Sequence, residues 1–316
     1  MPEQQSSEQQ SSEQLSSMAK RVAVTGASGL VGSRVVAAVK ERGYEVVRLV
    51  RSGNTLKADE LLWNPASGLA RPEQLNGFAA VIHLAGRSIA EARWTETEKN
   101  RIYDSRVAAT RQLVKQLVAL EQRPPIFIGA SAVGLYGDCG DEVVDESHPT
   151  GNDFLSEVVR HWEAAAAPLT EVGVRVAHAR LAMVLEPTGG ALAKVLPLFR
   201  WGLGGRLGSG KQYWSWIAME DVVSGMCWLL EQSEASGPYN FVSPEPVSNA
   251  EFTRALSNAV GRPAVLPVPR VALRMALGEM ANTVLLTSCR AVPKRLEAAG
   301  FAFRYKHLAD YFADKL

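Results

Sequence analysis

The sequence predicts an α/β protein built on a doubly wound parallel sheet, followed by a smaller, less regular C-terminal domain. Short β-branched runs alternate with longer amphipathic stretches from residue 20 to about residue 185, which is the pattern of a parallel sheet covered by helices on both faces. A glycine-rich turn joins the first run to the first amphipathic stretch. From about residue 188 the regular alternation ends.

The expected strands are short and mostly apolar, as buried parallel strands are. They cover residues 22–25, 45–50, 80–84, 125–128 and 174–177. The helices expected between them carry apolar residues at helical spacing and cover residues 33–42, 96–121 and 154–172. Further helices are expected in the second part of the chain, at residues 219–231, 249–260 and 271–281.

The N-terminal segment has a different composition from the rest of the chain. Residues 1–17 are almost entirely Gln, Ser and Glu, and such a segment buries too little apolar surface to offset its ordering entropy. We therefore expect residues 1–19 to form a disordered tail. It lacks the basic and apolar regions of a secretory signal, and its acidic residues argue against a transit peptide.

The composition argues against several classes of function. The 34 basic and 33 acidic residues leave a net charge of +1, so no overall field attracts nucleic acid or an anionic membrane. Cys139, Cys227 and Cys289 lie far apart without metal-ligand spacing, which argues against a disulfide framework or a zinc site. No apolar stretch reaches the roughly 20 residues that a membrane span needs. We expect a cytoplasmic protein, or one of an organelle stroma.

The glycine-rich turn has the features of a phosphate-binding loop. Residues 25–32 read Thr-Gly-Ala-Ser-Gly-Leu-Val-Gly, directly after a strand and directly before a helix. In that context glycines let the backbone approach a pyrophosphate, whose charge then lies at the helix N-terminus. The sequence predicts a dinucleotide site formed by Thr25, Gly26, Ser28, Gly29, Leu30, Val31 and Gly32. The alternative is a glycine turn without a ligand.

The end of the second strand indicates which dinucleotide is bound. NAD-binding proteins usually place an Asp or Glu there to bond the ribose 2′-hydroxyl. Here the strand ends in Val50 and is followed by Arg51, and a guanidinium pairs well with a 2′-phosphate. The sequence therefore favours NADP(H) over NAD(H). The alternative is that Arg51 is a solvated charge at the end of a strand.

Further motifs follow the later strands. Residues 83–86 read His-Leu-Ala-Gly, and residues 131–137 read Ser-Ala-Val-Gly-Leu-Tyr-Gly. Shorter motifs lie at residues 93–94, 105–107, 199–205, 214–217, 244–246, 262–263 and 278–281. With these motifs the chain resembles the atypical extended short-chain dehydrogenase/reductases, and more narrowly the NAD-dependent epimerase/dehydratase-like subfamily with a C-terminal domain of unknown function.

The resemblance implies a Rossmann fold, with a dinucleotide-binding domain at residues 20–235 and a substrate-side domain at residues 246–312. It implies that Ser131 bonds a substrate oxygen and that Arg180 follows a strand near the nicotinamide. It also implies that the adenosine side of the cofactor is lined by His83, Leu84, Ala85 and Gly86. For His83 the alternative is a buried, hydrogen-bonded histidine without a chemical role.

The Tyr and Lys that carry out acid–base chemistry in this superfamily are missing from the expected helix. Four residues apart, such a pair shares one helical face, and the lysine lowers the pKa of the tyrosine. Here the tyrosine position is held by Phe154 or Leu155 and the lysine position by Val158 or Val159. A literal match at residues 311–315 lies at the extreme C-terminus, and we interpret it as coincidence. Tyr136 is our first alternative for the proton donor, although a packing role is equally consistent with its sequence context.

The second part of the chain contributes a glycine-rich, basic segment beside tryptophans. Arg206 and Lys211 lie between Trp201, Trp214 and Trp216, which suits an anionic or ring-bearing small molecule. The alternative for this segment is a structural loop. Two functions remain: an NADP(H)-dependent oxidoreductase or epimerase-like enzyme, or a non-catalytic NADP(H)-binding regulator with a protein partner. The division-related label of some similar proteins points to the second.

Overall fold

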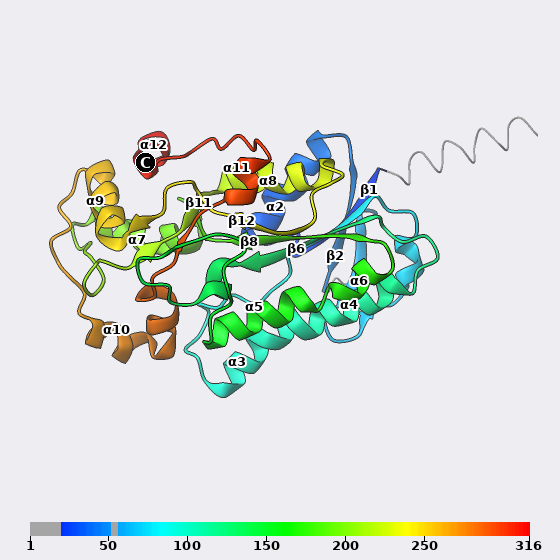
Figure 1. Cartoon of the computed structure of the whole chain (residues 1–316), viewed down its shortest axis with the longest axis horizontal. Helices are drawn as coiled ribbons and strands as arrows, with labels where there is room; N and C mark the ends of the chain where they lie inside the picture. The colour runs from blue at the N-terminus through cyan, green and yellow to red at the C-terminus, as the bar shows by residue number, and fades with distance from the viewer. Residues whose placement is uncertain (1–19, 52–55) are drawn as a thin grey trace, which may run out of the picture.

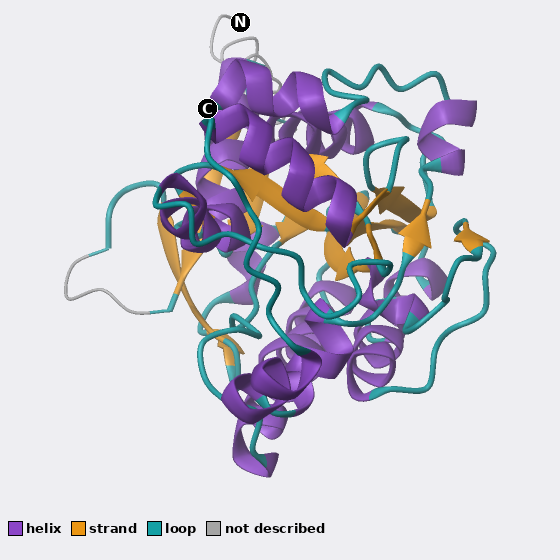
Figure 2. Ribbon diagram, turned by 90° about the vertical axis from the view of Figure 1, so that its left-hand side faces the viewer, coloured by secondary structure: helices purple, strands orange, loops and turns teal. Residues whose placement is uncertain are grey.

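The computed structural model describes residues 20–51 and 56–316. A central sheet lies between two layers of helices, and further helices and short strands extend beyond one end of it (Figure 1, Figure 2). The expected α/β fold with a doubly wound, mostly parallel sheet is therefore confirmed. The tail expected at residues 1–19 lies outside the described residues.

In the described chain the central sheet has eight strands: β1 (Arg21–Thr25), β2 (Glu45–Val50), β3 (Glu60–Asn64), β4 (Gly68–Leu69), β5 (Ala80–His83), β6 (Ile126–Ala132), β8 (Arg175–Leu181) and β12 (Gly237–Phe241). Their order is β12-β8-β6-β5-β1-β2-β3-β4, and the β3–β4 pair is antiparallel whereas the others are parallel. Because β2 and β5 flank β1, the chain order reverses there. Ligands of such sheets bind beside that point, beyond the carboxyl ends of the strands.

Helices cover both faces of the sheet (Figure 1). One face carries two helices that pack against each other, α2 (Leu30–Glu41) and α8 (Met219–Glu231). The other face carries α4 (Ala109–Val118), α5 (Phe154–Ala164) and α6 (Ala167–Glu171). α3 (Glu96–Tyr103) runs into α4 through the π-helical turn η2 (Asp104–Ala108).

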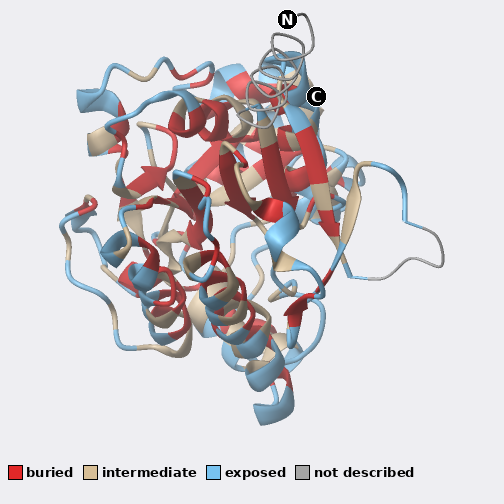
Figure 3. Ribbon diagram, turned by 90° about the vertical axis from the view of Figure 1, so that its right-hand side faces the viewer, coloured by how far each residue is buried: buried red, intermediate tan, exposed pale blue. Residues whose placement is uncertain are grey.

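Side chains of the central strands alternate between two cores, because successive residues of a strand point to opposite faces. Val22, Val24 and Ile82 are fully buried in the core that includes α2 and α8. Ala23 and Val81 are fully buried in the core that includes α4. Figure 3 shows the buried sheet in the middle of the molecule and the exposed outer faces of the helices. Burial on both faces explains the continuous apolar runs in the sequence.

The remaining elements are short: η1 (Pro72–Leu75), η3 (Val133–Tyr136), β7 (Val143–Val144), β9 (Met183–Glu186), α7 (Gly190–Arg200), β10 (Tyr213–Trp214), β11 (Trp216–Ala218), β13 (Val247–Ser248), α9 (Asn249–Val260), α10 (Arg270–Leu277), η4 (Ala281–Leu285), β14 (Arg290–Ala291), α11 (Lys294–Ala298) and α12 (Leu308–Lys315). β14 pairs with β7, so the C-terminal part of the chain adds a strand to the segment that leaves β6. Among the described residues, no helix has both the length and the apolar character to cross a membrane.

Several elements match the expected boundaries, and others differ for clear reasons. β2, α8 and α9 begin and end at the expected residues. α2 begins at Leu30 rather than at residue 33, and the long helix expected at residues 96–121 is divided by η2. β12 is not among the expected strands. It contains Gly237 and Pro238, which are unfavourable inside a strand, but it lies at the edge of the sheet, where proline is tolerated.

Asp221 connects α8 to the segment that precedes α12. Its side chain is 1% exposed and accepts hydrogen bonds from the backbone N–H groups of Arg304, at 2.6 Å, and of Tyr305, at 3.1 Å. Burial raises the pKa of Asp221, and these two hydrogen bonds oppose the rise because they stabilise the carboxylate. The Asp221 side chain therefore connects the C-terminal segment to α8, which packs against the central sheet.

Asp221→Ala should lower the free energy of unfolding by about 2–4 kcal/mol, because two buried amides lose their acceptor. Urea denaturation of the full chain measures this loss. Asp310→Ala, which removes an exposed carboxylate on α12, is the matched control and should change the stability by no more than about 0.5 kcal/mol. Equal losses in the two variants would show that the hydrogen bonds of Asp221 are unimportant.

Candidate functional site

The glycine loop between β1 and α2 is pressed against the end of β5. Gly26 has a φ of +67°, and a Cβ there would lie 2.7 Å from the carbonyl carbon of Leu84. A Cβ on Gly32 would lie 2.1 Å from the carbonyl oxygen of Gly26. Contacts this short exclude a side chain, so both positions require glycine. The loop therefore presents bare backbone at the carboxyl edge of the sheet, as pyrophosphate binding requires.

The N-terminus of α2 is open toward this edge. Gly29 is the N-cap residue and supplies no side-chain hydrogen bond, and the first turn of the helix contains no acidic residue. Ser28, Gly29 and Leu30 are exposed. Free amides and the positive end of the helix dipole attract an anion. The structure thus gathers the loop residues expected to bind phosphate, which are Thr25, Gly26, Ser28, Gly29, Leu30, Val31 and Gly32.

Thr25 and His83 hold the glycine loop against β5 from within the protein. The Thr25 hydroxyl accepts the backbone N–H groups of Leu84 at 3.1 Å and Ala85 at 3.2 Å, and lies 2.7 Å from Nδ1 of His83. Nε2 of His83 lies 3.0 Å from the hydroxyl of Thr110. Since the Thr25 hydroxyl already accepts two hydrogens, it donates its own to Nδ1, and the ring carries its hydrogen on Nε2.

His83 is therefore a neutral, buried histidine. Its side chain is fully buried, and burial lowers its pKa to about 4. Both ring nitrogens have partners inside the protein. This environment matches the alternative of a hydrogen-bonded histidine that supports the loop, rather than a direct contact with the adenosine.

The other residues expected around the cofactor lie on neighbouring strands. Arg51 directly follows β2 and is exposed. Leu84, Ala85 and Gly86 directly follow β5. Because β2, β1 and β5 are adjacent in the sheet, these residues and the glycine loop share one edge, at the point where the order of the strands reverses.

A buried ion pair joins α5 to β8. Arg180 donates from Nε to Oε1 of Glu163 at 2.8 Å and from Nη2 to Oε2 at 2.9 Å, and the hydroxyl of Ser131 donates to Oε1 at 2.5 Å. Burial raises the pKa of Glu163, but the hydrogen bonds from Arg180 and Ser131 and the neighbouring positive charges outweigh burial and hold it below its usual range. Arg180 was expected to follow a strand near the nicotinamide. Instead it lies within β8, and its guanidinium binds α5.

Tyr136 belongs to the same buried network. Its side chain is 2% exposed, and its hydroxyl donates to Oδ1 of Asn240 at 2.7 Å and accepts from Nη1 of Arg180 at 2.9 Å. Burial raises the pKa of Tyr136 to about 12. The hydroxyls of both Ser131 and Tyr136 are thus bonded inside the protein, which fits a positioning role better than proton transfer to a ligand.

The four apolar residues of α5 at the acid–base positions are packed against the protein. Leu155 contacts the turn η3 at Gly134, and Val159 belongs to the same buried cluster as Tyr136. The ring of Phe154 packs edge-on against that of Trp94, with 5.2 Å between the ring centroids, and Val158 is buried. None of these side chains carries a proton that it can donate.

The Tyr-x-x-x-Lys match at residues 311–315 lies on α12, away from α5. Tyr311 is fully buried in the core shared by α7, α9 and α12, and Lys315 pairs with Glu220 at 2.6 Å. Both side chains therefore serve the packing of α12, which agrees with the interpretation of this match as coincidence.

The three tryptophans of the second part have different surroundings. Trp201 is 78% exposed at the end of α7. Trp216 is fully buried and donates to the carbonyl oxygen of Glu245 at 2.9 Å, and Trp214 is half-buried. Arg206 and Lys211 are exposed. Trp216 therefore fits the alternative of a structural loop with tryptophans in the core, while Trp201, Arg206 and Lys211 lie at the surface.

Sequence reasoning missed three residues of this edge: Glu163, Asn240 and Arg106. Glu163 looks like a solvated charge on an amphipathic helix, and Asn240 lies in the unexpected strand β12. Arg106 lies in the motif at residues 105–107 but was given no role. The position of Arg106 depends on the π-helical turn η2, which the sequence does not reveal.

Comparison with protein families identifies the class of protein. Residues 22–242 match the NAD dependent epimerase/dehydratase family, and residues 268–314 match a domain of unknown function, DUF1731. The chain therefore belongs to the NAD dependent epimerase/dehydratase family. The resemblance to atypical extended short-chain dehydrogenase/reductases with this C-terminal domain is confirmed.

Individual relatives match over nearly the whole chain. An epimerase family protein of Mycobacterium bovis is 43% identical over 289 residues, which cover 92% of this chain and 95% of that protein. An Arabidopsis thaliana protein, named as the chloroplastic homologue of the epimerase family protein SDR39U1, is 37% identical over 300 residues, or 92% of this chain and 84% of that protein.

Solved structures are similar as well. Human epimerase family protein SDR39U1 (isoform 2), crystallised with NADPH, has a TM-score of 0.85 and 31% identity, and the match covers 93% of this chain and 98% of that one. A nucleoside-diphosphate sugar epimerase of Corynebacterium glutamicum has a TM-score of 0.78 and 34% identity, and the match covers 94% of this chain and 58% of that one. These similarities extend through the C-terminal region.

The buried His83 predicts a loss of stability in mild acid. Burial lowers its pKa from the ordinary 6.5 to about 4, so its neutral form stabilises the fold fully above pH 6.5, and that contribution is lost as the pH falls from 6.5 toward 4. The loss should reach about 3 kcal/mol. Urea denaturation across this pH range should show it, and His83→Asn should reduce it. His307→Asn, at an exposed position where the hydrogen bond with Glu245 raises the pKa of the histidine, should not reduce the acid-side loss.

Tyr136→Phe should lower the free energy of unfolding by about 1–3 kcal/mol, because Arg180 and Asn240 each lose a buried partner. Chemical denaturation measures the change. Tyr103→Phe is the control, since its hydroxyl contacts His161 at 3.2 Å in a less enclosed position, and it should cost less. A Tyr136→Phe protein as stable as the unaltered one would contradict the structural role.

Proposed function

We propose that this chain binds NADP(H) beyond the carboxyl ends of β1, β2 and β5 and acts on a small molecule as an oxidoreductase or epimerase-like enzyme. The observation that carries the proposal is the open N-terminus of α2 beside a loop that admits no side chain at Gly26 or Gly32. Backbone N–H groups in such a loop bind pyrophosphate. The NADPH in the crystal structure of the human relative supports the same cofactor here.

The preference for NADP(H) rests on the end of β2. The strand ends at Val50 without a carboxylate for a ribose 2′-hydroxyl, and the exposed Arg51 follows directly. In contrast, Arg48 of the same strand is already paired with Asp59 at 2.9 Å and Glu60 at 3.0 Å. Arg51 is therefore well placed at the end of β2 to pair with a 2′-phosphate.

A bound NADP(H) would supply or accept a hydride, and the residues of this chain would position the reactants. Leu155 and Val159, which hold two of the acid–base positions on α5, are apolar and pack against η3 and the buried cluster around Tyr136. In this proposal Ser131 and Tyr136 hold the Glu163–Arg180 pair in place through their hydrogen bonds. We therefore propose that any proton the reaction needs comes from water or from the substrate itself.

A non-catalytic NADP(H)-binding regulator is the second function we consider. The apolar Leu155 and Val159 at the acid–base positions of α5 favour a regulator, because they cannot transfer a proton. Exposed apolar side chains in the C-terminal half, such as Trp201, Val271 and Met275, also favour it, because they could contact a protein partner. Protein carrying NADPH deuterated at its transferable position can be incubated with a panel of small carbonyl compounds. Deuterium in any product supports the enzyme, and its absence from all products favours the regulator.

We also propose a location in the cytoplasm or an organelle stroma. The nearly neutral net charge of +1 gives no attraction to anionic membranes. The Arabidopsis relative is named as chloroplastic, which is consistent with a stromal compartment. Fluorescence microscopy of a tagged full-length chain in its own organism tests this, and a membrane-associated signal would contradict it.

Arg51→Ala should abolish the preference for NADPH over NADH. Losing a charged hydrogen bond to phosphate should weaken NADPH binding at least about tenfold, with little change for NADH. Fluorescence titration with each cofactor measures both affinities. Arg42→Ala removes a charge paired with Glu231 at the other end of α2 and should leave both affinities unchanged. Equal affinity for NADPH and NADH in the unaltered protein would overturn the assignment.

A further inference from the structure

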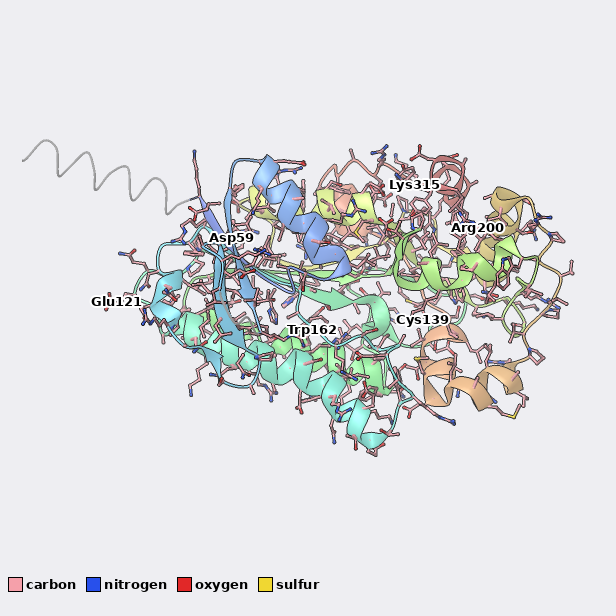
Figure 4. All side chains as sticks on the ribbon, turned by 180° about the vertical axis from the view of Figure 1, so that it is seen from behind. Asp59, Glu121, Cys139, Trp162, Arg200 and Lys315 are labelled. Carbon is pink, nitrogen blue, oxygen red and sulfur yellow. The ribbon has the colours of Figure 1, made fainter. Side chains whose placement is uncertain are left out.

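Arg106 lies at the site edge, in the π-helical turn η2. Such turns insert an extra residue and occur frequently at functional sites. The guanidinium lies 5.2 Å from the ring centroid of Trp162, which Figure 4 labels. It also faces the backbone directly after β5, since a Cβ on Gly86 would lie 3.4 Å from the guanidinium carbon. The positive charge is therefore close to the segment that packs against the glycine loop.

This guanidinium has no anionic partner in the part of the chain that the structure describes. Its hydrogen bonds are two long ones from Nη1, to the carbonyl oxygen of Ile102 and to the hydroxyl of Ser105, both 3.4 Å. Nε and Nη2 donate to no acceptor among residues 20–51 and 56–316. Burial lowers the pKa of Arg106 to about 10, and no neighbouring charge opposes that effect.

Other enclosed arginines of the protein have strong partners. Arg180 forms the two-pronged pair with Glu163, and the half-buried Arg87 donates to the buried Glu98 at 2.5 Å. Arg175, which like Arg106 forms no salt bridge in the described chain, donates to the carbonyl oxygen of Leu229 at 2.9 Å near the C-terminus of α8. Arg106 alone among these four has only long contacts.

The position of Arg106 separates it from the expected places of the cofactor phosphates. Those places are the N-terminus of α2 and the end of β2, on one side of β5. Arg106 lies on the other side, because its neighbours Val107 and Trp162 pack with Ala130 of β6 and Leu181 of β8. An anion at Arg106 would therefore belong to a second ligand beside the cofactor.

We propose that Arg106 binds an anionic group, a carboxylate or a phosphate, of the small molecule on which this protein acts. The proposal rests on the proposed function, because it places that molecule next to the bound dinucleotide. Arg106 is half-buried, and a charge that is partly removed from water without an anionic partner carries a free-energy cost, which a ligand anion would reduce on binding. A guanidinium also recognises carboxylate and phosphate through two parallel hydrogen bonds.

Stability of the full chain without ligand gives the first test. Arg106→Met keeps a flexible side chain over Trp162 and removes an uncompensated charge, so its Tm should equal or exceed that of the unaltered protein. Arg180→Met is the matched control: it removes a compensated charge and leaves Glu163 buried alone, so its Tm should fall by several degrees. A comparable fall in both variants would show that Arg106 is structural and would overturn the proposal.

Anion binding gives the second test. Malonate and inorganic phosphate are titrated separately into NADPH-saturated protein, with chloride at equal ionic strength as the reference, and Tm is followed. The unaltered protein should show a saturable rise with at least one anion, and Arg106→Met should weaken that binding at least about tenfold. The anion affinity of Arg106→Lys should lie between those of the unaltered protein and Arg106→Met, because lysine keeps the charge but cannot form two parallel hydrogen bonds.

The affinity for NADPH, measured for each protein, separates the possible sources of the anion. It should change less than about threefold in Arg106→Met. A tenfold loss would assign the anion to the cofactor and overturn the proposal, as would identical anion responses in both proteins or no saturable response in either. Failure of the unaltered protein to bind NADPH would contradict the proposed function instead, and the same titration on unliganded protein would then decide the role of Arg106.

Discussion

The buried ion pair between Glu163 and Arg180 is the contact on which the carboxyl edge of the sheet depends. It joins α5 to β8, Ser131 adds β6, and Tyr136 extends the network to Asn240 on β12. Removing one member of such a pair leaves the other charge buried alone, at a cost of about 3–5 kcal/mol. The strands and helix that surround the site are therefore held in place before any ligand binds.

The same network limits the chemistry that the protein can perform. The hydroxyls of Ser131 and Tyr136 already have partners in it, and the apolar Leu155 and Val159 of α5 pack toward η3 and Tyr136. A proton relay of the usual kind has no groups to use there. Rate acceleration by this protein would depend on holding the cofactor and the substrate in the right geometry, which rigid surroundings favour.

The parts of the structure that sequence could predict are those determined by local patterns. The glycine loop at residues 25–32 and the apolar runs of the central strands follow from steric and burial rules that act over a few residues. Pairings between distant residues carry no such local signal: Tyr136 and Asn240 are 104 residues apart, and Arg180 and Glu163 are 17 apart. Arg180 was therefore expected beside the cofactor, although its side chain turns to α5.

The distribution of charge connects the fold to its ligands. Where an arginine completes the framework, as Arg180 and Arg87 do, a carboxylate compensates it inside the protein. Arg51 is exposed on one side of the glycine loop, and Arg106 lies uncompensated on the other, across β5. A net charge of only +1 gives no general attraction for anions, so attraction at this edge has to come from local placement. A dinucleotide phosphate at one arginine and an anionic substrate at the other would together neutralise the positive charge of this edge.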